Sequence, residues 1–322
     1  MLLAAGARST YHIGMECCAH ARPHAGITIM QRVICAGLIA ADLVFDVDAF
    51  PVKGSKHRAG GARLITGGGA LNAASAIAAL GGVASLAGVV GDDMFGDFLR
   101  RAIHDRGIDD RYLTTVTGAG TSCSANLISP DEDRTIINHR DGSLTPDLAD
   151  LPANFPFDAA LVDTRWAEGA AHVVAAARKA GKPAVVDAEA PVALARTALE
   201  GASHVVFSEQ GLADFAGACD GAALARATTQ LSGWCAVTRG GAPVLSHDGQ
   251  RLSQHPVFPA VALNTLGAGD VWHGAFALAL ARQMPEPDAV RFANAAASLK
   301  VRRPVDDETW PGAAEVAALI EG

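Results

Sequence analysis

Asn264-Thr265-Leu266-Gly267-Ala268-Gly269-Asp270 is a glycine-rich turn that opens into an apolar run ending near Arg282. Glycines let the backbone N–H groups approach a ligand closely, and the first N–H groups of the following helix have no partner within it. The helix dipole adds about half a positive charge at that end. We therefore expect the backbone of Gly267, Ala268 and Gly269 to bind an anion such as a phosphoryl group.

Asp270 is the only carboxylate in this run and lies beside the predicted anion site. That position suits a general base that accepts a proton from a hydroxyl attacking a phosphoryl group. The alternative is that Asp270 only caps the helix and that the glycines only turn the chain. The motif alone does not decide between the two, because short glycine motifs recur by chance.

A second glycine run, Gly67-Gly68-Gly69, leads into a helix whose first turn carries Asn72. An amide side chain can donate and accept hydrogen bonds with a polyhydroxy substrate. Together, and in this order, the two motifs resemble the signature patterns of the PfkB (ribokinase-like) family of carbohydrate kinases. The resemblance runs from about Gln31 to the C-terminus. It departs from the usual second pattern at Asn264, where the family has Asp.

The resemblance implies an α/β, ribokinase-like fold in which a central, mostly parallel sheet is flanked by helices. It also implies a small β-sheet lid that closes over the sugar and excludes water, which would otherwise take the phosphoryl group. We expect residues 30–322 to form one kinase domain, with the lid drawn from about 43–66 and 119–140. The β-rich segments of this lid are Leu43–Asp48, Lys56–Ile65, Ser122–Ile128 and Arg134–Asn138. Because such lids often pair in relatives, a homodimer through the lid is expected.

Apolar strands alternate with alanine-rich, helix-length segments along the rest of the chain. This alternation is typical of a parallel sheet with helices on both faces. The predicted helices are Gly69–Leu80 and Met94–Arg106, with Gly107 as the stop of the second. The predicted strands are Arg32–Leu38, Val83–Ala87, Ala159–Val162, Pro183–Val186, His204–Phe207 and Cys235–Thr238.

Composition agrees with a single enzyme domain. The chain has 322 residues, of which 50% are hydrophobic and 19% are charged, so it can bury a large core. Its net charge of −8 offers no basic footprint for nucleic acid. The six cysteines include no Cys-x-x-Cys pair, so neither a disulfide framework nor a zinc site is indicated, and a cytoplasmic protein is expected.

Two further expectations concern the ends and the membrane. No apolar run reaches transmembrane length, so no membrane association is expected. Residues 1–29 precede the first strand and are expected to be a disordered leader, or to reflect a start codon assigned too far upstream.

Asp42 follows the first predicted strand, at the edge where open parallel sheets place ligand contacts. A carboxylate suits vicinal hydroxyls because it accepts two hydrogen bonds at once. By the resemblance, Asp42 binds sugar hydroxyls together with Gly68, Gly69 and Asn72. The alternative is a turn-forming Asp.

Three segments together resemble the sulfofructose kinase branch of the family more than ribokinases or fructokinases. They are Asp163-Thr164-Arg165-Trp166, Thr135-Ile136-Ile137-Asn138 and Ser208-Glu209-Gln210-Gly211-Leu212. The resemblance implies that Lys56, Asn138 and Arg165 hold a sulfonate. Lys supplies a point charge, Asn an amide donor and Arg a fork of N–H donors, and these groups suit a tetrahedral anion. Alternatively, Lys56 is a solvated charge on the lid, Asn138 forms a hydrogen bond at the end of a strand, and Arg165 forms a structural ion pair.

Nucleotide binding is expected from the C-terminal half, because the chain lacks the Gly-x-x-x-x-Gly-Lys-Ser/Thr of P-loop kinases. By the resemblance, Thr238, Gly240 and Gly241 form the turn on the nucleotide side. Asn294 and Ala297 lie on the helix that lines the adenine pocket in relatives. Each of these residues alone is as easily a turn or a packing residue.

ATP and Mg²⁺ are the implied cofactors, since Mg²⁺ neutralises the β- and γ-phosphate oxygens during transfer. The usual Asn-x-x-Glu near this metal appears here as Ser208-Glu209-Gln210-Gly211, which leaves Glu209 as the carboxylate. A monovalent-cation site is common in relatives. Asn264 and Pro304-Val305 depart from its usual pattern, so that site stays open.

The sequence therefore predicts an ATP-dependent sugar kinase that phosphorylates a primary hydroxyl, with 6-deoxy-6-sulfofructose as the first candidate. Other candidates are ribose, fructose, a sugar of the 2-keto-3-deoxygluconate type or a nucleoside. A different class is a sugar or nucleotide sensor that keeps the fold but has lost turnover, as Asn264 and the missing Asn-x-x-Glu indicate. Retention of Asp270 with both glycines favours the enzyme, because a binder does not need the base.

Overall fold

The computed structural model describes residues 30–322, apart from 130–133, 146–147, 149–150, 152–154 and 305–308. The described strands form two sheets, one of nine strands and one of four. The larger sheet has the order β13-β12-β11-β10-β9-β8-β1-β4-β5. Its strands are β1 (Arg32–Ala36), β4 (Val83–Gly91), β5 (Asp109–Val116), β8 (Ala159–Asp163), β9 (Ala184–Ala188), β10 (His204–Phe207), β11 (Trp234–Arg239), β12 (Ala242–His247) and β13 (Leu252–His255).

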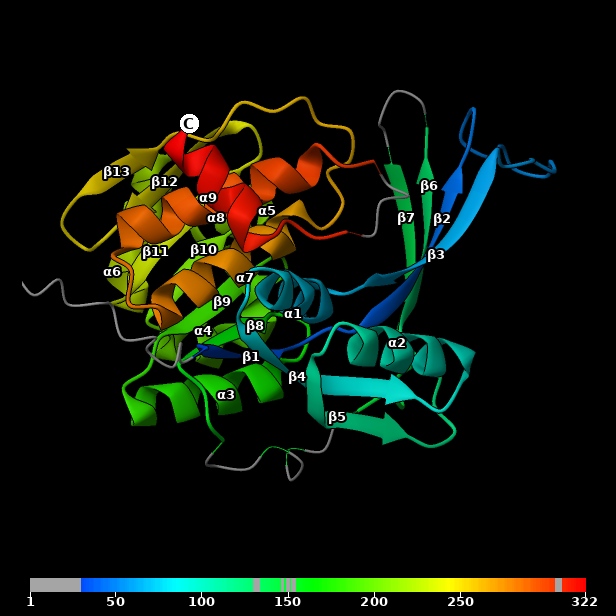
Figure 1. Ribbon diagram of the computed structural model, residues 1–322, viewed down its shortest axis with the longest axis horizontal. Coiled ribbons are helices and arrows are strands. Elements are labelled where there is room, and N and C mark those ends of the chain that lie inside the picture. Colours follow the sequence, from blue (N-terminus) through cyan, green and yellow to red (C-terminus); the bar gives the residue numbers. More distant parts are fainter. Residues whose placement is uncertain (1–29, 130–133, 146–147, 149–150, 152–154, 305–308) are drawn as a thin grey trace, which may run out of the picture.

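Helices cover both faces of the larger sheet (Figure 1). Neighbouring strands from β11 to β5 run parallel, and β12 and β13 add an antiparallel edge. In β1, Val33 and Cys35 face one helix layer while Ile34 and Ala36 face the other, because successive side chains alternate. The first layer is α1 (Gly69–Ala79), α2 (Met94–Asp105), α7 (Ala268–Ala281), α8 (Glu286–Val301) and α9 (Ala313–Glu321). The second is α3 (Ala167–Ala180), the 3-10 helix η2 (Val192–Ala195), α4 (Arg196–Gly201), α5 (Glu209–Ala216) and α6 (Gly221–Leu231).

The smaller sheet stands to one side of this body (Figure 1) and has the order β3-β2-β6-β7. Its strands are β2 (Ala40–Asp46), β3 (Gly61–Gly67), β6 (Cys123–Ile128) and β7 (Arg134–His139). β2 pairs parallel with β6, and the other two pairings are antiparallel. The chain runs from β1 into β2 and from β3 directly into α1, so this sheet is attached beside the start of α1.

The predicted α/β fold with a large, mostly parallel sheet flanked by helices and a smaller separate sheet is confirmed. Every predicted strand and helix is present, with ends that differ by a few residues. Gly107 directly follows the cap of α2 with φ of 65°, as expected for a helix stop. β5, β12 and β13 were not predicted, because these strands, at or next to the two edges of the sheet, expose part of their residues and are not continuous buried apolar runs.

Residues 1–29, the predicted leader, lie outside the described residues. In the part of the chain that the structure describes, no helix combines the length and the apolar character needed to cross a bilayer. Four cysteines of this part, Cys35, Cys123, Cys219 and Cys235, are free.

Candidate active site

The two glycine motifs meet where helices α1 and α7 begin. Gly274 of α7 packs so closely on α1 that a Cβ there would lie 2.6 Å from the carbonyl oxygen of Ala73. This approach lets Asn72 Nδ2 donate a hydrogen bond of 2.8 Å to Asp270 Oδ2. Gly267 caps α7 with φ of 73°, a conformation that favours glycine. Residues far apart in the chain thus form one site.

Asn264, the departure from the family pattern, keeps the turn before α7 in place. Its Oδ1 accepts a hydrogen bond of 2.9 Å from the backbone N–H of Leu266. Asn and Asp both form this local bond, because each has an acceptor oxygen at the same position. The substitution therefore leaves the geometry of the glycine loop intact.

Asp270 has a strongly shifted pKa. Burial of the carboxyl, with a smaller contribution from the nearby charge of Asp187, raises its pKa to about 7, against the hydrogen bond from Asn72. Such a carboxylate is a stronger base than that of an ordinary Asp. Near pH 7 the group is ionised in about half of the protein molecules. A pKa near the working pH is what general base catalysis requires.

A cavity of about 590 Å³ lies between the starts of α1 and α7 and the smaller sheet. Its volume falls in the range of small-molecule pockets, roughly 300–1,000 Å³. Most residues predicted to bind the sugar or the transferred group line it, and we call it the sugar cavity after that prediction. These are Asp42, Gly68, Gly69, Asn72, Asn138, Arg165, Gly267, Gly269 and Asp270.

Asp42 is held by a short chain of hydrogen bonds from the smaller sheet. Ser124 Oγ donates to Asp42 Oδ1 at 2.6 Å, and Asn126 Nδ2 donates to Ser124 Oγ at 2.8 Å. Burial raises the pKa of Asp42, and the bond from Ser124 opposes that shift. Ser124 and Asn126 were missed in the sequence, although their alternate positions on one strand place them on the same face.

Asp163 anchors the loops around the cavity. Its Oδ2 accepts from the backbone N–H of Leu38 at 2.7 Å, and its Oδ1 accepts from that of Arg165 at 2.8 Å. A Cβ at Gly37 would lie 2.1 Å from the carboxyl, so glycine is required there. Asp163 therefore ties the carboxyl ends of β1 and β8 together.

A second cavity of about 500 Å³ lies on the other side of the α7 start. All the residues predicted to bind the nucleotide line it, namely Thr238, Gly240, Gly241, Asn294 and Ala297. Ala268 lines this cavity too, and both cavities share Thr265 and Gly269. Ligands in the two cavities would meet at the helix start that the glycine motif builds.

Asn294 contributes to the wall of this cavity through structural bonds. Its Oδ1 accepts from Trp272 Nε1 at 2.7 Å, and its Nδ2 donates to the carbonyl of Pro256 at 3.0 Å. These bonds join α7, α8 and the loop after β13. Asn294 thus fixes the shape of the pocket, and its buried neighbour Trp272 is a lining residue that the sequence analysis missed.

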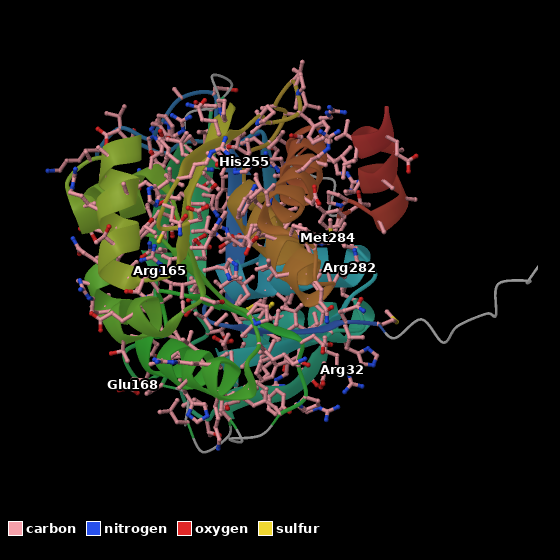
Figure 2. The ribbon with its side chains drawn as sticks, turned by 90° about the vertical axis from the view of Figure 1, so that its left-hand side faces the viewer. Arg32, Arg165, Glu168, His255, Arg282 and Met284 are labelled. Atoms are coloured by element: carbon pink, nitrogen blue, oxygen red, sulfur yellow. The ribbon has the colours of Figure 1, made fainter. Side chains whose placement is uncertain are left out.

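Of the three residues predicted to hold a sulfonate, Asn138 and Arg165 line the sugar cavity and Lys56 does not. Lys56 lies on the exposed loop between β2 and β3 and is not part of either cavity wall. Arg165 reaches the sugar cavity, but its Nη2 lies 2.6 Å from Glu189 Oε2 and its Nη1 donates to the carbonyl of Ala190. Arg165 follows the end of β8, and Arg32 is the first residue of β1. Figure 2 labels Arg165 on the left of the molecule and Arg32 at the lower right. The structural ion pair, the alternative for Arg165, is present.

Other basic side chains line the sugar cavity from β7 and the segment after it. They are Arg134, His139 and Arg140, none of which the sequence analysis singled out. Arg140 Nη1 donates to the carbonyl of Arg165 at 2.5 Å. Among the described residues, neither Arg134 nor Arg140 forms an ion pair with a carboxylate. The cavity is nevertheless of mixed charge, because five carboxylates of the described part line it too, and the charge of Arg140 opposes the rise in the pKa of one of them, Asp163.

The predicted metal ligand, Glu209, is exposed at the start of α5 and lines neither cavity. Across the described ranges, no group of three or more His, Cys, Asp or Glu side chains is arranged to hold a metal ion. The described part of the chain thus holds no preformed cage of protein ligands for Mg²⁺.

Comparison with known proteins gives a consistent result. Residues 30–311 match the pfkB family carbohydrate kinase. Ribokinase of Lactococcus lactis is 26% identical over 294 residues, which cover 91% of this chain and 98% of that one. The ATP-dependent ribose-1-phosphate kinase of Halopiger xanaduensis is 28% identical over 313 residues, covering 90% and 98%. A solved structure from Agrobacterium tumefaciens with a provisional ribokinase assignment is 31% identical, with a TM-score of 0.84 and coverage of 91% and 98%. This chain therefore belongs to the pfkB family of carbohydrate kinases.

Proposed function

We propose that the chain transfers the γ-phosphoryl group of ATP to a primary hydroxyl of a sugar. Phosphotransferase activity and ATP as the donor follow from its family. The observation that carries the proposal is the position of Asp270. Its carboxyl faces the sugar cavity, while the residue before it, Gly269, lines both cavities.

The reaction needs a base, an anion site and a held sugar. Asp270 accepts the proton of the sugar hydroxyl as its oxygen bonds to the γ-phosphorus and the bond to the ADP oxygen breaks. Backbone N–H groups at the start of α7 donate to the phosphoryl oxygens during transfer. Asp42 holds further sugar hydroxyls, and Asn72 keeps the Asp270 carboxyl in place.

Mg²⁺ remains a prediction for this chain. The ion usually keeps several waters and binds through substrate phosphates with one or two carboxylates, so the lack of a dedicated cage among the described residues is compatible with it. When bound, it would neutralise the β- and γ-phosphate oxygens. Glu209 is not proposed as its ligand, because that side chain lies outside both cavities.

For the sugar, we propose a monosaccharide that carries an acidic group away from the attacked hydroxyl. Arg134 and Arg140 support this choice, because the two exposed guanidinium groups at one side of the cavity can pair with an anionic group. Sulfofructose is one member of this class, yet it gains no support from Lys56 or from the comparisons. Since relatives are ribokinases and a ribose-1-phosphate kinase, ribose and its phosphates are the leading competitors.

The smaller sheet is proposed as a lid, with β2, β6 and β7 supplying residues to the sugar cavity. Closure of such a lid would exclude water from the phosphoryl group. The exposed outer face of β7 supports pairing with the lid of a second subunit. A cytoplasmic location stays a prediction from the cysteine pattern.

The test is ADP release from ATP across a panel of neutral and anionic sugars, with wild type and Asp270→Asn. Asn keeps the shape and the hydrogen bonding but does not accept the proton. We expect kcat to fall by about two to four orders of magnitude, with ATP still bound. Equal turnover in the two proteins would remove Asp270 as the base. Sugar or nucleotide binding without any ADP release would favour the sensor instead.

A further inference from the structure

A buried histidine lies directly behind the glycine loop. His273 is one turn after Asp270 on α7, and its side chain is 4% exposed. Its Nδ1 lies 2.7 Å from the carbonyl oxygen of Gly269. A carbonyl only accepts hydrogen bonds, so Nδ1 carries a proton and donates it. The histidine thereby holds the peptide that joins Gly269 to Asp270.

The other ring nitrogen of His273 faces a carboxylate from β9. His273 Nε2 lies 3.4 Å from Asp187 Oδ1, and the Asp187 side chain is 19% exposed. Nε2 is a buried atom with no hydrogen bond in the structure. Burial lowers the pKa of His273, while burial and the nearby charge of Glu189 raise the pKa of Asp187 well above its usual range. Both shifts favour the uncharged forms of the two side chains, in which a protonated Asp187 carboxyl can donate to Nε2.

We propose that His273 and Asp187 act as positioning residues that hold the Gly269–Asp270 peptide in its active orientation. That peptide carries the Asp270 N–H, one of the amides at the start of α7. Its rotation would turn this N–H away from the phosphoryl group and move the base. The inference rests on the proposed function of Asp270 and adds a side chain that holds the carbonyl of Gly269.

Asp187 also lines the sugar cavity, so a direct contact with the sugar is the competing role. The two roles differ in kinetics. A positioning pair acts on the transition state and lowers kcat, whereas loss of a sugar contact raises KM for the sugar. The two roles also differ in the effect expected of Asp187→Asn. In the positioning role this variant keeps most of the kcat, because the Asn amide can still donate to Nε2.

The kinetic experiment uses two variants at each position. His273→Phe fills the space without a hydrogen bond, and His273→Asn keeps a donor near the Gly269 carbonyl. Asp187→Leu removes the partner of Nε2, and Asp187→Asn keeps one. We expect His273→Phe and Asp187→Leu to lower kcat roughly 10- to 100-fold with KM for both substrates nearly unchanged, and the Asn variants to recover most of that loss.

Leu278→Ala is the control for stability, since it opens a cavity on the same helix away from the loop. It should lower Tm while leaving kcat and KM unchanged. Unchanged kcat in His273→Phe, or a raised sugar KM without kcat loss in Asp187→Leu, would overturn the proposal. An equal kcat loss in Leu278→Ala would do so too, because the effect would then be general destabilisation.

A second measurement does not depend on catalysis. In protein labelled with ¹⁵N-histidine, His273 should show an Nδ1–H protected from exchange, assigned by its loss in His273→Asn. Its Nε2 resonance should shift in Asp187→Leu. Absence of the protected Nδ1–H, or no shift in that variant, would refute the pair even if no sugar is turned over. Failure of the whole sugar panel with these signals present would instead refute the proposed kinase function.

Discussion

Asp270 is placed where its charge is costly to the fold and useful to the reaction. The folded protein holds the carboxyl partly buried beside Asp187, so its neutral form is favoured up to about pH 7. In the unfolded chain the same group ionises near the ordinary aspartate pKa of 3.8. Stability and activity should therefore depend on pH in opposite directions.

The pH dependence gives one prediction. A folded pKa raised above the unfolded value contributes stability at low pH that is lost as pH rises through about 7. Asp270→Asn, which does not ionise, should therefore raise Tm relative to wild type near pH 8 and much less near pH 4. The kcat of wild type should rise through about pH 7 as the base ionises. Thermal unfolding and kcat as functions of pH measure the two effects.

Asp141→Asn is the control of opposite sign. Hydrogen bonds from the backbone of Gly120 and Ser143 lower the pKa of Asp141 to about 2. Its stabilising contribution is present above its unfolded pKa and is lost as pH falls toward about 2. This variant should therefore lower Tm near pH 8. A Tm of Asp270→Asn that stays below wild type at every pH would contradict the assigned pKa shift.

A second prediction separates Arg140, which is proposed for the sugar's acidic end, from Lys56, which only the sequence pattern assigned to it. Arg140→Ala should raise KM for an anionic sugar by about tenfold, a modest effect because this residue is exposed. The KM for a neutral sugar should change little. Lys56→Ala is the matched control and should affect neither KM, since Lys56 is remote from the cavity. Steady-state kinetics with paired anionic and neutral sugars decide the point, and a larger effect of Lys56→Ala would restore the sulfonate site predicted from the sequence.

At the scale of elements, the active site depends on the contact between α1 and α7. Gly274 permits this contact, because a Cβ would meet the backbone of Ala73 at 2.6 Å. The contact in turn sets the distance between Asn72 and Asp270. Gly269 is different, since a Cβ there would meet nothing within 4 Å.

These two glycines give a matched pair of variants. Gly274→Ala should push the helices apart, lower Tm and lower kcat together, because overpacking typically costs about 1–3 kcal/mol. Gly269→Ala should keep Tm close to wild type and lower kcat, because its methyl group would enter the space where the two cavities meet. Calorimetry and ADP release measure both quantities. If Gly269→Ala kept full activity, the loop would only turn the chain.

The sequence could predict the features that depend on local pattern, and it could not predict those that depend on contacts between distant parts of the chain. Strands such as His204–Phe207 are short apolar runs between helices, and their period and length are local properties. The glycine motifs are local too, and they placed Asp270 and Asn72 in one site. Ser124, Asp187, His273 and Arg140 were missed, because their roles arise only when strand ends from distant parts of the chain meet. Lys56 lies on a loop outside both cavity walls, and its place relative to the cavity is likewise a long-range property that the sequence pattern does not give.

At the scale of the whole molecule, the smaller sheet has two faces with different tasks. Ile136 of β7 lines the sugar cavity, so its neighbour Ile137 lies on the opposite face, because side chains alternate along a strand. Ile137 is 62% exposed on this edge strand. Exposed apolar side chains on a sheet edge favour association with another chain.

If two lids pair through this face, Ile137→Asp should dissociate the dimer, because it places a charge in an apolar contact. Sedimentation velocity at micromolar concentration should then show a monomer, and wild type a dimer. The KM for the sugar should rise several-fold, since an unpaired lid closes less well, while KM for ATP should stay constant because its cavity is remote from β7. Leu194→Asp is the control, as Leu194 is similarly exposed at 65% but lies on η2. Wild type that sediments as a monomer throughout would refute lid pairing, and a dimer that survives Ile137→Asp would place the interface on another surface.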